Sequence, residues 1–185
     1  RPYLLFVSQW RPHKGIQNLV KSFEILDKRF KIHDLKLVIT GKPNPKFPEI
    51  EERVNSSALR PRIITPGFVE EKDMTSLYAN AAAFVFPSIY EGFGLNPLEA
   101  MACETPVVAV REGGYRETII DGKTGFLVDR NPIEIADKIR FLTSHPRAAQ
   151  RMGRSARRHV VRNWSWERGI EKLNEYLEET VRNTH

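Results

Sequence analysis

Short apolar runs alternate with longer amphipathic segments along the whole chain. The runs at 83–86 and 107–110 contain no polar side chain, which is typical of strands buried on both faces of a parallel sheet. In 16–30, by contrast, apolar residues recur at the spacing of one helix face. We therefore predict an α/β fold, a doubly wound Rossmann-like parallel sheet of about six strands with helices on both faces.

The predicted elements follow one another without an internal repeat, so we expect residues 1–185 to form one domain. The predicted strands are 4–7, 37–39, 63–64 (closed by Pro66-Gly67), 83–86, 107–110 and 125–128. The predicted helices cover about 16–30, 49–59, 72–80, 97–103, 115–120, 132–144, 146–161 and 166–182.

Composition argues against several classes of protein. No apolar run approaches the roughly 20 residues of a membrane-spanning helix. Cys103 is the only cysteine, which fits a reducing compartment and predicts a cytoplasmic protein. The histidines are scattered and none pairs with another at ligand spacing, so we predict no metal site. The net charge of +6 favours an anionic partner, and charge alone leaves nucleotide, nucleic acid and anionic lipid open.

In a doubly wound sheet, ligands bind beyond the carboxyl ends of the strands. The loops to inspect are therefore 8–15, 41–48, 67–73, 87–96 and 111–117.

The loop after the fourth predicted strand carries the strongest chemical signal. Gly92-Phe93-Gly94 would let backbone N–H groups approach an anion just before a helix, although a tight turn alone would also explain the two glycines. Glu91 follows an apolar strand at a point where an acid neither caps a helix nor has an obvious partner. This combination predicts a site for a polyhydroxylated, phosphate-bearing ligand.

Two explanations of Glu99 remain open. Asn96 reads as a helix N-cap and Pro97 as the first helical residue, which would put Glu99 at the third position, where an acid offsets the helix dipole. The functional alternative is that the Glu99 carboxylate accepts hydrogen bonds from the hydroxyls of a ribose.

The first strand-to-helix loop is basic. Lys14 closes it, and Arg11 and His13 add further donors. A lysine at this place can reach a phosphate held over the end of the next helix, whereas the alternative is a solvated basic loop.

Two familiar phosphate-binding motifs are absent. The segment 121–125 ends like a P-loop, but Glu117 stands where the earlier glycine is required, and the segment reads as a hairpin-like turn before a strand. No G-x-G-x-x-G follows the first strand either.

One late helix has a basic face, formed by Arg147, Arg151, Arg154, Arg158 and Arg162. It lies opposite Ala149, Met152, Ala156 and Val160. A solvated polar face explains this pattern, and so does electrostatic attachment to anionic lipid. We expect Trp164 and Trp166 to pack and so to dock the last helix.

The sequence resembles the large retaining glycosyltransferase family four (glycosyl transferases group 1), whose members have the two-domain GT-B fold. The motifs that carry the resemblance are 87–99, 100–102, 105–109, Lys14-Gly15, Gly67-Phe68, Gly113-Gly114 with Glu117, 121–125 and Ser165-Trp166. The resemblance implies that residues 1–185 are the C-terminal, donor-binding half of such an enzyme, without its N-terminal acceptor domain. The chain opens directly on a strand and lacks an initiator Met, which also suggests a domain cut from a longer protein.

The resemblance also implies roles for individual residues. Glu91 would contact the donor sugar and support transfer, and Glu99 would bind ribose. The loop Gly92, Phe93, Gly94 and Leu95 would hold sugar and phosphate through its backbone. Lys14 would neutralise the diphosphate, so that neither a metal nor a cofactor is needed.

Three positions depart from the family pattern. Gln9 stands where the family often has an arginine, which Arg11 could replace from the same loop. Glu104 occupies a usual glycine position, so the local turn should differ. Arg116 replaces a common proline.

The function expected from these residues is transfer of a sugar, of mannosyl or glucosyl type, from a nucleoside-diphosphate sugar with retention of configuration. The acceptor, a saccharide or a lipid-linked glycan, would bind through the missing half, and the isolated fragment would be inactive. We expect no nucleic-acid partner, and any membrane contact would be peripheral, at the inner face. The alternatives are a non-catalytic nucleotide-sugar or partner-binding module and a sugar-nucleotide epimerase of the same fold. The residues do not identify the base, the sugar, the acceptor or the oligomeric state.

Overall fold

The computed structural model describes residues 2–183 and contains a six-stranded, entirely parallel sheet. Its strand order is β3-β2-β1-β4-β5-β6, so the direction of winding reverses between β1 and β4. The strands are β1 (Tyr3–Phe6), β2 (Lys36–Thr40), β3 (Ile63–Gly67), β4 (Ala83–Phe86), β5 (Val107–Val110) and β6 (Phe126–Val128). The predicted doubly wound, Rossmann-like fold is confirmed.

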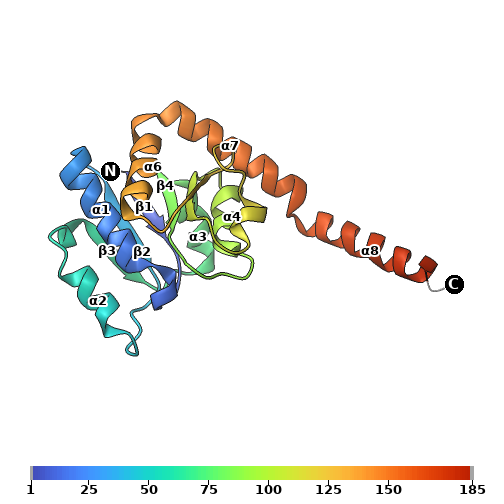
Figure 1. The fold of residues 1–185 in the computed structure, drawn as a ribbon, viewed down its shortest axis with the longest axis horizontal. Coiled ribbons are helices and arrows are strands. Elements are labelled where there is room, and N and C mark those ends of the chain that lie inside the picture. Colours follow the sequence, from blue (N-terminus) through green and yellow to red (C-terminus); the bar gives the residue numbers. More distant parts are fainter. Residues whose placement is uncertain (1, 184–185) are drawn as a thin grey trace.

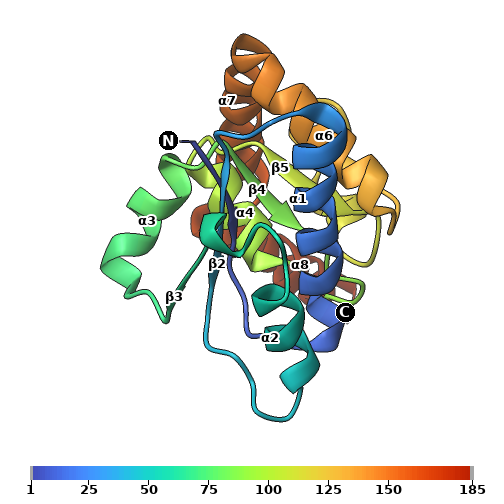
Figure 2. The same ribbon diagram turned by 90° about the vertical axis from the view of Figure 1, so that its left-hand side faces the viewer.

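Helices cover both faces of the sheet. They are α1 (Ile16–Phe30), α2 (Pro48–Asn55), α3 (Glu71–Ala79), α4 (Leu95–Ala102), α5 (Tyr115–Thr118), α6 (Pro132–Ser144), α7 (Pro146–Asn163) and α8 (Trp166–Asn183). Helix α1 packs against α2 and α6 on one face, and α4 packs against α3 and α7 on the other (Figure 2). The last helix, α8, extends away from the body of the domain (Figure 1). None of the helices formed by residues 2–183 is both long and apolar enough to cross a membrane.

A row of aromatic rings links the core to the carboxyl edge of the sheet. Phe86 stacks between Phe6 and Phe84, with ring centroids 5.5 Å from each. Its third neighbour is the buried ring of Tyr115 at the start of α5, which meets it edge-on at 6.1 Å. Such pairs add about 0.5–1.5 kcal/mol beyond their buried area. The core therefore holds Tyr115 in place beneath the loop that follows β4.

Several sequence predictions about helix ends and packing are wrong. Helix α4 begins at Leu95 after Gly94, so Asn96 is not its N-cap. Asn96 instead donates its side-chain amide to the carbonyl of Val7, 2.7 Å away, at the end of β1. The predicted helices 49–59 and 115–120 end early, at Asn55 and Thr118. The predicted turn at 121–125 is confirmed: it lies directly before β6 and is closed by a bond from Gly122 N–H to the Gly125 carbonyl.

The two late tryptophans differ in environment. Trp164 packs edge-on against Phe93, with ring centroids 5.1 Å apart, so its predicted packing role is confirmed. Trp166 is 86% exposed, so the same prediction was wrong for it. Both tryptophans lie at the α7–α8 junction. Helical periodicity in the sequence indicates that a helix has an apolar face, but it does not indicate which element covers that face.

The departure at Glu104 has a structural consequence. Glu104 adopts φ of 61°, the left-handed conformation that glycine takes easily and other L-residues adopt at a cost of about 1–2 kcal/mol. Its carbonyl lies so close to Gly153 of α7 that a Cβ there would overlap it. The backbone is therefore held in this conformation by packing against α7.

We predict that Glu104→Gly raises the melting temperature by about 1–4 °C. Relief of the strained φ exceeds the extra chain entropy that glycine loses on folding, and about 1 kcal/mol corresponds to 2–4 °C at this size. Thermal unfolding followed by circular dichroism measures the shift. Glu104→Ala is the control, because it removes the carboxyl group and keeps the strain, so it should give no increase. Equal increases for both variants would assign the effect to charge instead.

Candidate active site

Two loops meet at the carboxyl edge of the sheet because β1 and β4 are neighbours. The loop after β1 offers the carbonyl of His13, which accepts from Ser88 Oγ at 3.0 Å and from Ile89 N–H at 2.8 Å. Both donors belong to the loop after β4. These bonds join two segments that are about 75 residues apart in the sequence.

Two glycines permit the close approach of these loops. Gly15 has φ of 71°, and a Cβ there would overlap the Pro87 carbonyl. Gly94 has φ of 83°, and a Cβ there would fall within the ring of Tyr115. Both positions thus need glycine for conformation and for space.

The junction of the loops holds an ion pair between Lys14 and Glu91. Lys14 Nζ contacts Glu91 Oε1, which also accepts from Ser88 Oγ at 3.0 Å. The two side chains are only 15% and 17% exposed. The ammonium group also lies 5.6 Å from the centre of the Phe86 ring. The sequence predicted both charged residues as ligand contacts, and the structure adds that they bind each other.

Free backbone donors lie next to this pair. Among the contacts formed within 2–183, the N–H groups of Gly92, Phe93 and Gly94 donate to no protein acceptor. They precede the first turn of α4, where the partial positive charge of a helix end favours an anion. Gly92 and Phe93 are exposed, as is Leu95 at 62%, whereas Gly94 is buried. The predicted loop therefore offers donors at Gly92 and Phe93 that an anion can reach, with the Gly94 N–H behind them.

Tyr115 is a candidate site residue that the sequence analysis missed. Its hydroxyl group is buried and has no hydrogen-bond partner in the part of the chain that the structure describes. Burial, and then the charge of Glu91, raise the pKa of Tyr115 well above its usual value, so the phenol stays protonated. It can donate a hydrogen bond beside Glu91. The one sequence feature that could have pointed to Tyr115 is the Gly113-Gly114 pair directly before it, in the loop after β5.

Glu99 lies on α4 and contacts Tyr78 of α3 rather than the loop after β1. Since α4 begins at Leu95, Glu99 is in its second turn, and the predicted capping explanation is wrong. Tyr78 donates its hydroxyl to Glu99 Oε2 at 2.8 Å, and burial, followed by the Glu99 charge, raises the pKa of Tyr78. The other carboxylate oxygen accepts from no side chain or backbone group among the described residues, and Glu99 is exposed.

Arg11 and His13 supply less positive charge to the site than the sequence suggested. Arg11 is exposed, and its guanidinium has no ion pair within residues 2–183. Burial, and then the charges of Lys14 and Arg11, lower the pKa of His13, against an opposing effect of Glu91. His13 is therefore mainly neutral at neutral pH, and this loop carries two cations rather than three.

A hollow of about 600 Å³ lies between the loops after β1, β2 and β3, the first of which also carries Lys14. Phe68, 74% exposed, and Val69 line one side, and Gln9 and Pro43 line others. Trp10 is fixed at its base by a bond from Nε1 to the Thr40 carbonyl at 3.1 Å. Apart from Lys42 its lining is uncharged, so it suits a flat, neutral group.

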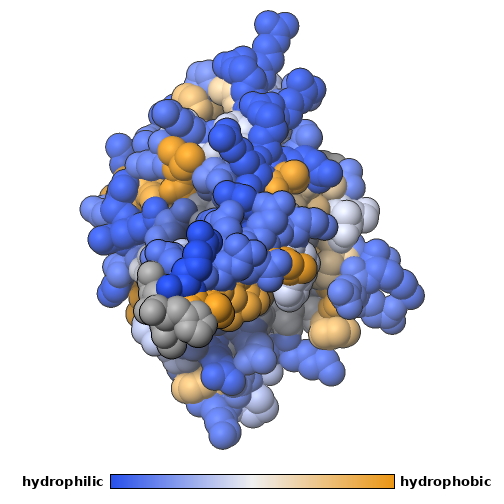
Figure 3. Space-filling model, turned by 90° about the vertical axis from the view of Figure 1, so that its right-hand side faces the viewer, coloured by the Kyte–Doolittle hydropathy of each residue, from blue (hydrophilic) through white to orange (hydrophobic). Residues whose placement is uncertain are grey.

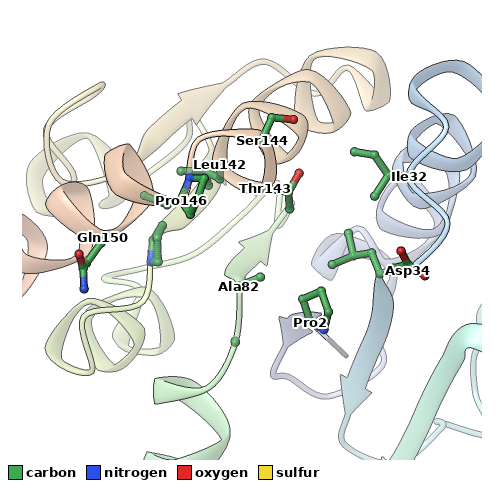
Figure 4. Close-up of a pocket in the computed structure, with 13 residues that line it drawn as sticks. Pro2, Ile32, Asp34, Ala82, Leu142, Thr143, Ser144, Pro146 and Gln150 are labelled. Carbon is green, nitrogen blue, oxygen red and sulfur yellow. The ribbon is translucent and has the colours of Figure 1, made fainter.

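A second hollow, of about 490 Å³, opens at the opposite edge of the sheet (Figure 4). Its lining comes from the segments before β1, β2, β4 and β5 and from the α6–α7 junction, and it is mostly apolar. Asp34 is its only charged side chain among the described residues. Its other lining residues with polar side chains are Thr143, Ser144 and Gln150, so the hollow offers a ligand mainly apolar contacts.

No three His, Cys, Asp or Glu side chains within residues 2–183 are grouped so as to hold a metal ion. The prediction that the reaction needs neither metal nor cofactor stays a prediction.

A family model described as "Glycosyl transferases group 1" matches residues 1–159. The chain belongs to this family. The resemblance inferred from 87–109 and the surrounding motifs is therefore confirmed.

Individual relatives place the domain within its family. One curated relative is the GDP-mannose-dependent alpha-(1-6)-phosphatidylinositol monomannoside mannosyltransferase of Mycolicibacterium smegmatis. The chain is 30% identical to it over 185 positions, and the match covers 96% of this chain and 48% of that protein.

One solved structure that is similar is a mutant of S. aureus TarM in complex with Fondaparinux, alpha-GlcNAc-glycerol and UDP. It is 28% identical, with a TM-score of 0.84 over 94% of this chain and 34% of that one.

A solved C-terminal domain is also similar. The C-terminal domain of a glycosyl transferase group 1 family protein from Francisella tularensis is 27% identical, with a TM-score of 0.79 over 89% of this chain and 87% of that one. This glycosyltransferase-family chain thus spans about half the length of its curated relative and matches most of a solved C-terminal domain. Its sheet corresponds to one Rossmann-like half of the GT-B fold.

We predict that Gly94→Ala lowers the stability of the domain by about 2–4 kcal/mol. The positive φ and the overlap with the Tyr115 ring both disfavour a Cβ. Gly92→Ala is the matched control, since a Cβ there meets open space at an ordinary φ. Urea unfolding of both variants gives the free energies. If Gly94→Ala is as stable as Gly92→Ala, the described packing of the loop against Tyr115 is incorrect.

Proposed function

We propose that this domain binds a nucleoside-diphosphate sugar and supports transfer of the sugar with retention of configuration. The observation that carries the proposal is the Lys14–Glu91 pair beside the free N–H groups of Gly92, Phe93 and Gly94. This arrangement supplies a cation and neutral donors for a diphosphate, and a carboxylate for sugar hydroxyls. The comparisons add support, since one relative is named for GDP-mannose and one solved neighbour contains UDP.

Each part of the donor has a matching part of the site. The diphosphate would lie over the start of α4, where Lys14 exchanges its contact with Glu91 for the phosphates. Glu91 is then free to accept from the sugar, while Ser88 Oγ stays within hydrogen-bond distance of it and the Tyr115 hydroxyl, which has no partner among the described residues, can donate to it. The uncharged hollow at Phe68 and Val69 would hold the base, and Glu99 the ribose. Mannose and glucose are the proposed sugars.

Charge stabilisation of the departing nucleoside diphosphate is the main catalytic contribution in this proposal. Lys14, with Arg11 in support, balances the charge that develops on the leaving phosphate, and so neither a metal nor a cofactor is required. Arg11 thereby takes the place of the family arginine that Gln9 replaces.

We propose that the acceptor binds through an N-terminal half that residues 1–185 do not include, so that these residues alone bind donor and do not transfer. Helix α8 fits this proposal because it presents an uncovered apolar stripe; Figure 3 faces the end of the molecule to which α8 points and shows apolar patches (orange) among the hydrophilic surface. The stripe consists of Trp166, Ile170, Leu173, Tyr176, Leu177 and Val181, each 56–86% exposed.

The proposed acceptor is a saccharide or a lipid-linked glycan. The proposed location is the cytoplasm, at the inner face of the membrane.

Lys14→Ala should weaken binding of the matching nucleoside diphosphate about 10- to 100-fold and leave binding of the nucleoside nearly unchanged. A charge-assisted hydrogen bond contributes about 1.5–3 kcal/mol. Isothermal titration of the chain with UDP, GDP and ADP, and with their nucleosides, measures both affinities. Lys21→Ala is the control, since it removes an exposed lysine from α1. An equal loss of nucleoside and diphosphate affinity would rule out a phosphate contact.

In the complete enzyme, Glu91→Ala should lower kcat for transfer on the order of a hundredfold or more, because a preorganised group at the reacting sugar is lost. Glu52→Ala, an exposed residue of α2, should keep normal turnover. Initial rates with saturating donor give kcat directly. Near-normal turnover by Glu91→Ala would remove Glu91 from the catalytic role.

A further inference from the structure

Helix α7 concentrates the positive charge of the chain. It contains six arginines and no acidic residue. The chain has 29 Lys and Arg residues, and the 23 that lie outside α7 equal its 23 Asp and Glu residues. The net charge of the chain, +6, therefore equals the charge of the six arginines of α7.

Five of these arginines form a straight stripe, at positions 147, 151, 154, 158 and 162. All five are exposed, and the opposite side of α7 is buried through Ala149, Met152, Gly153 and Ala156. At 1.5 Å per residue, the stripe is about 22 Å long. Figure 1 shows α7 on the outside of the domain, which leaves this face open. The predicted basic face is confirmed.

The stripe does not stabilise the domain by itself. No ion pair involves these five arginines among the residues for which the structure gives contacts. Neighbours four positions apart, such as Arg154 and Arg158, repel each other and destabilise the helix. Arg147 lies in the first turn, where a cation opposes the helix dipole. A partner that supplies negative charge would offset all of these effects.

A polar hollow of about 900 Å³ runs along the same helix. Arg154, Arg158 and Arg162 line it together with Lys123 from the turn before β6, and Glu104 is its only acidic residue among those described. The Nε2 atom of His159 is buried at this hollow without a hydrogen-bond partner in the described part of the chain. The hollow is wide enough for a phosphate headgroup and carries the charge to bind one.

We propose that the arginine stripe of α7 and this hollow bind the surface of an anionic phospholipid bilayer. A straight row of cations on a helix that lies flat can meet many headgroups at once, and each contributes separately to binding. No aromatic side chain is interleaved with these arginines, as base stacking on a nucleic acid would require. Helix α8 is excluded from this role, because acidic residues outnumber basic ones on it. The bilayer contact does not depend on the donor site.

Vesicle co-sedimentation of the purified chain tests this proposal. The probes are vesicles of phosphatidylcholine alone and of phosphatidylcholine with about 30 mol% anionic phosphatidylglycerol. We expect binding to the anionic vesicles only, and its loss at high salt because the attraction is screened. The triple variant Arg154→Gln, Arg158→Gln, Arg162→Gln should bind about a hundredfold more weakly, since each arginine near the surface contributes about a fivefold factor.

A charge-matched control separates the stripe from net charge. Lys21→Gln, Lys28→Gln, Lys46→Gln removes three exposed lysines elsewhere and should bind almost as well as the unaltered chain. Circular dichroism confirms that both triple variants are folded. Failure of the unaltered chain to bind anionic vesicles would overturn the proposal. Equal losses in both triple variants, or tighter binding to single-stranded nucleic acid than to vesicles, would overturn it as well.

Discussion

The ion pair between Lys14 and Glu91 connects the two loops on which the candidate site depends. It can form only because β1 and β4 are adjacent in the sheet, which brings together residues 77 positions apart. The pair is mostly shielded from solvent, so each charge needs the other while no ligand is bound. An anion that takes Lys14 would free Glu91 next to it. In the proposed function, this one contact would link the binding of phosphate to the release of a carboxylate toward a sugar.

The surroundings of the pair hold its geometry through packing rather than through further charges. Ser88 Oγ lies 3.0 Å from both the His13 carbonyl and Glu91 Oε1, so its single hydroxyl hydrogen is shared between these acceptors and holds the loop after β4 against the loop after β1. The ring of Tyr115 fills the space beside Gly94, and Phe86 supports that ring from the core. A side chain at Gly94 would disturb all of these contacts. The packing of Tyr115 and Phe86 therefore supports the loop that carries the unpaired backbone N–H groups.

Much of this arrangement could be predicted from the sequence, for identifiable reasons. Apolar runs such as 83–86 determined the strands, and the topology of a parallel sheet then placed Lys14 and Glu91 at one edge. The start of α4 was mispredicted because Asn96-Pro97 is a typical capping pair, whereas the Asn96 amide is used by the Val7 carbonyl across the sheet. Tyr115 was missed because its closeness to Glu91 follows from the approach of two loops, which no local pattern encodes. The exposure of Trp166 likewise depends on where α8 points.

We propose that the N–H groups of Gly92, Phe93 and Gly94 bind the diphosphate of a nucleotide donor. Hydrogen exchange at these amides, read by NMR with and without saturating UDP, GDP or ADP, tests this binding. One nucleotide should slow exchange at all three amides, and the corresponding nucleoside should not. Unchanged exchange at these amides, in a chain whose titration shows that the nucleotide is bound, would contradict it.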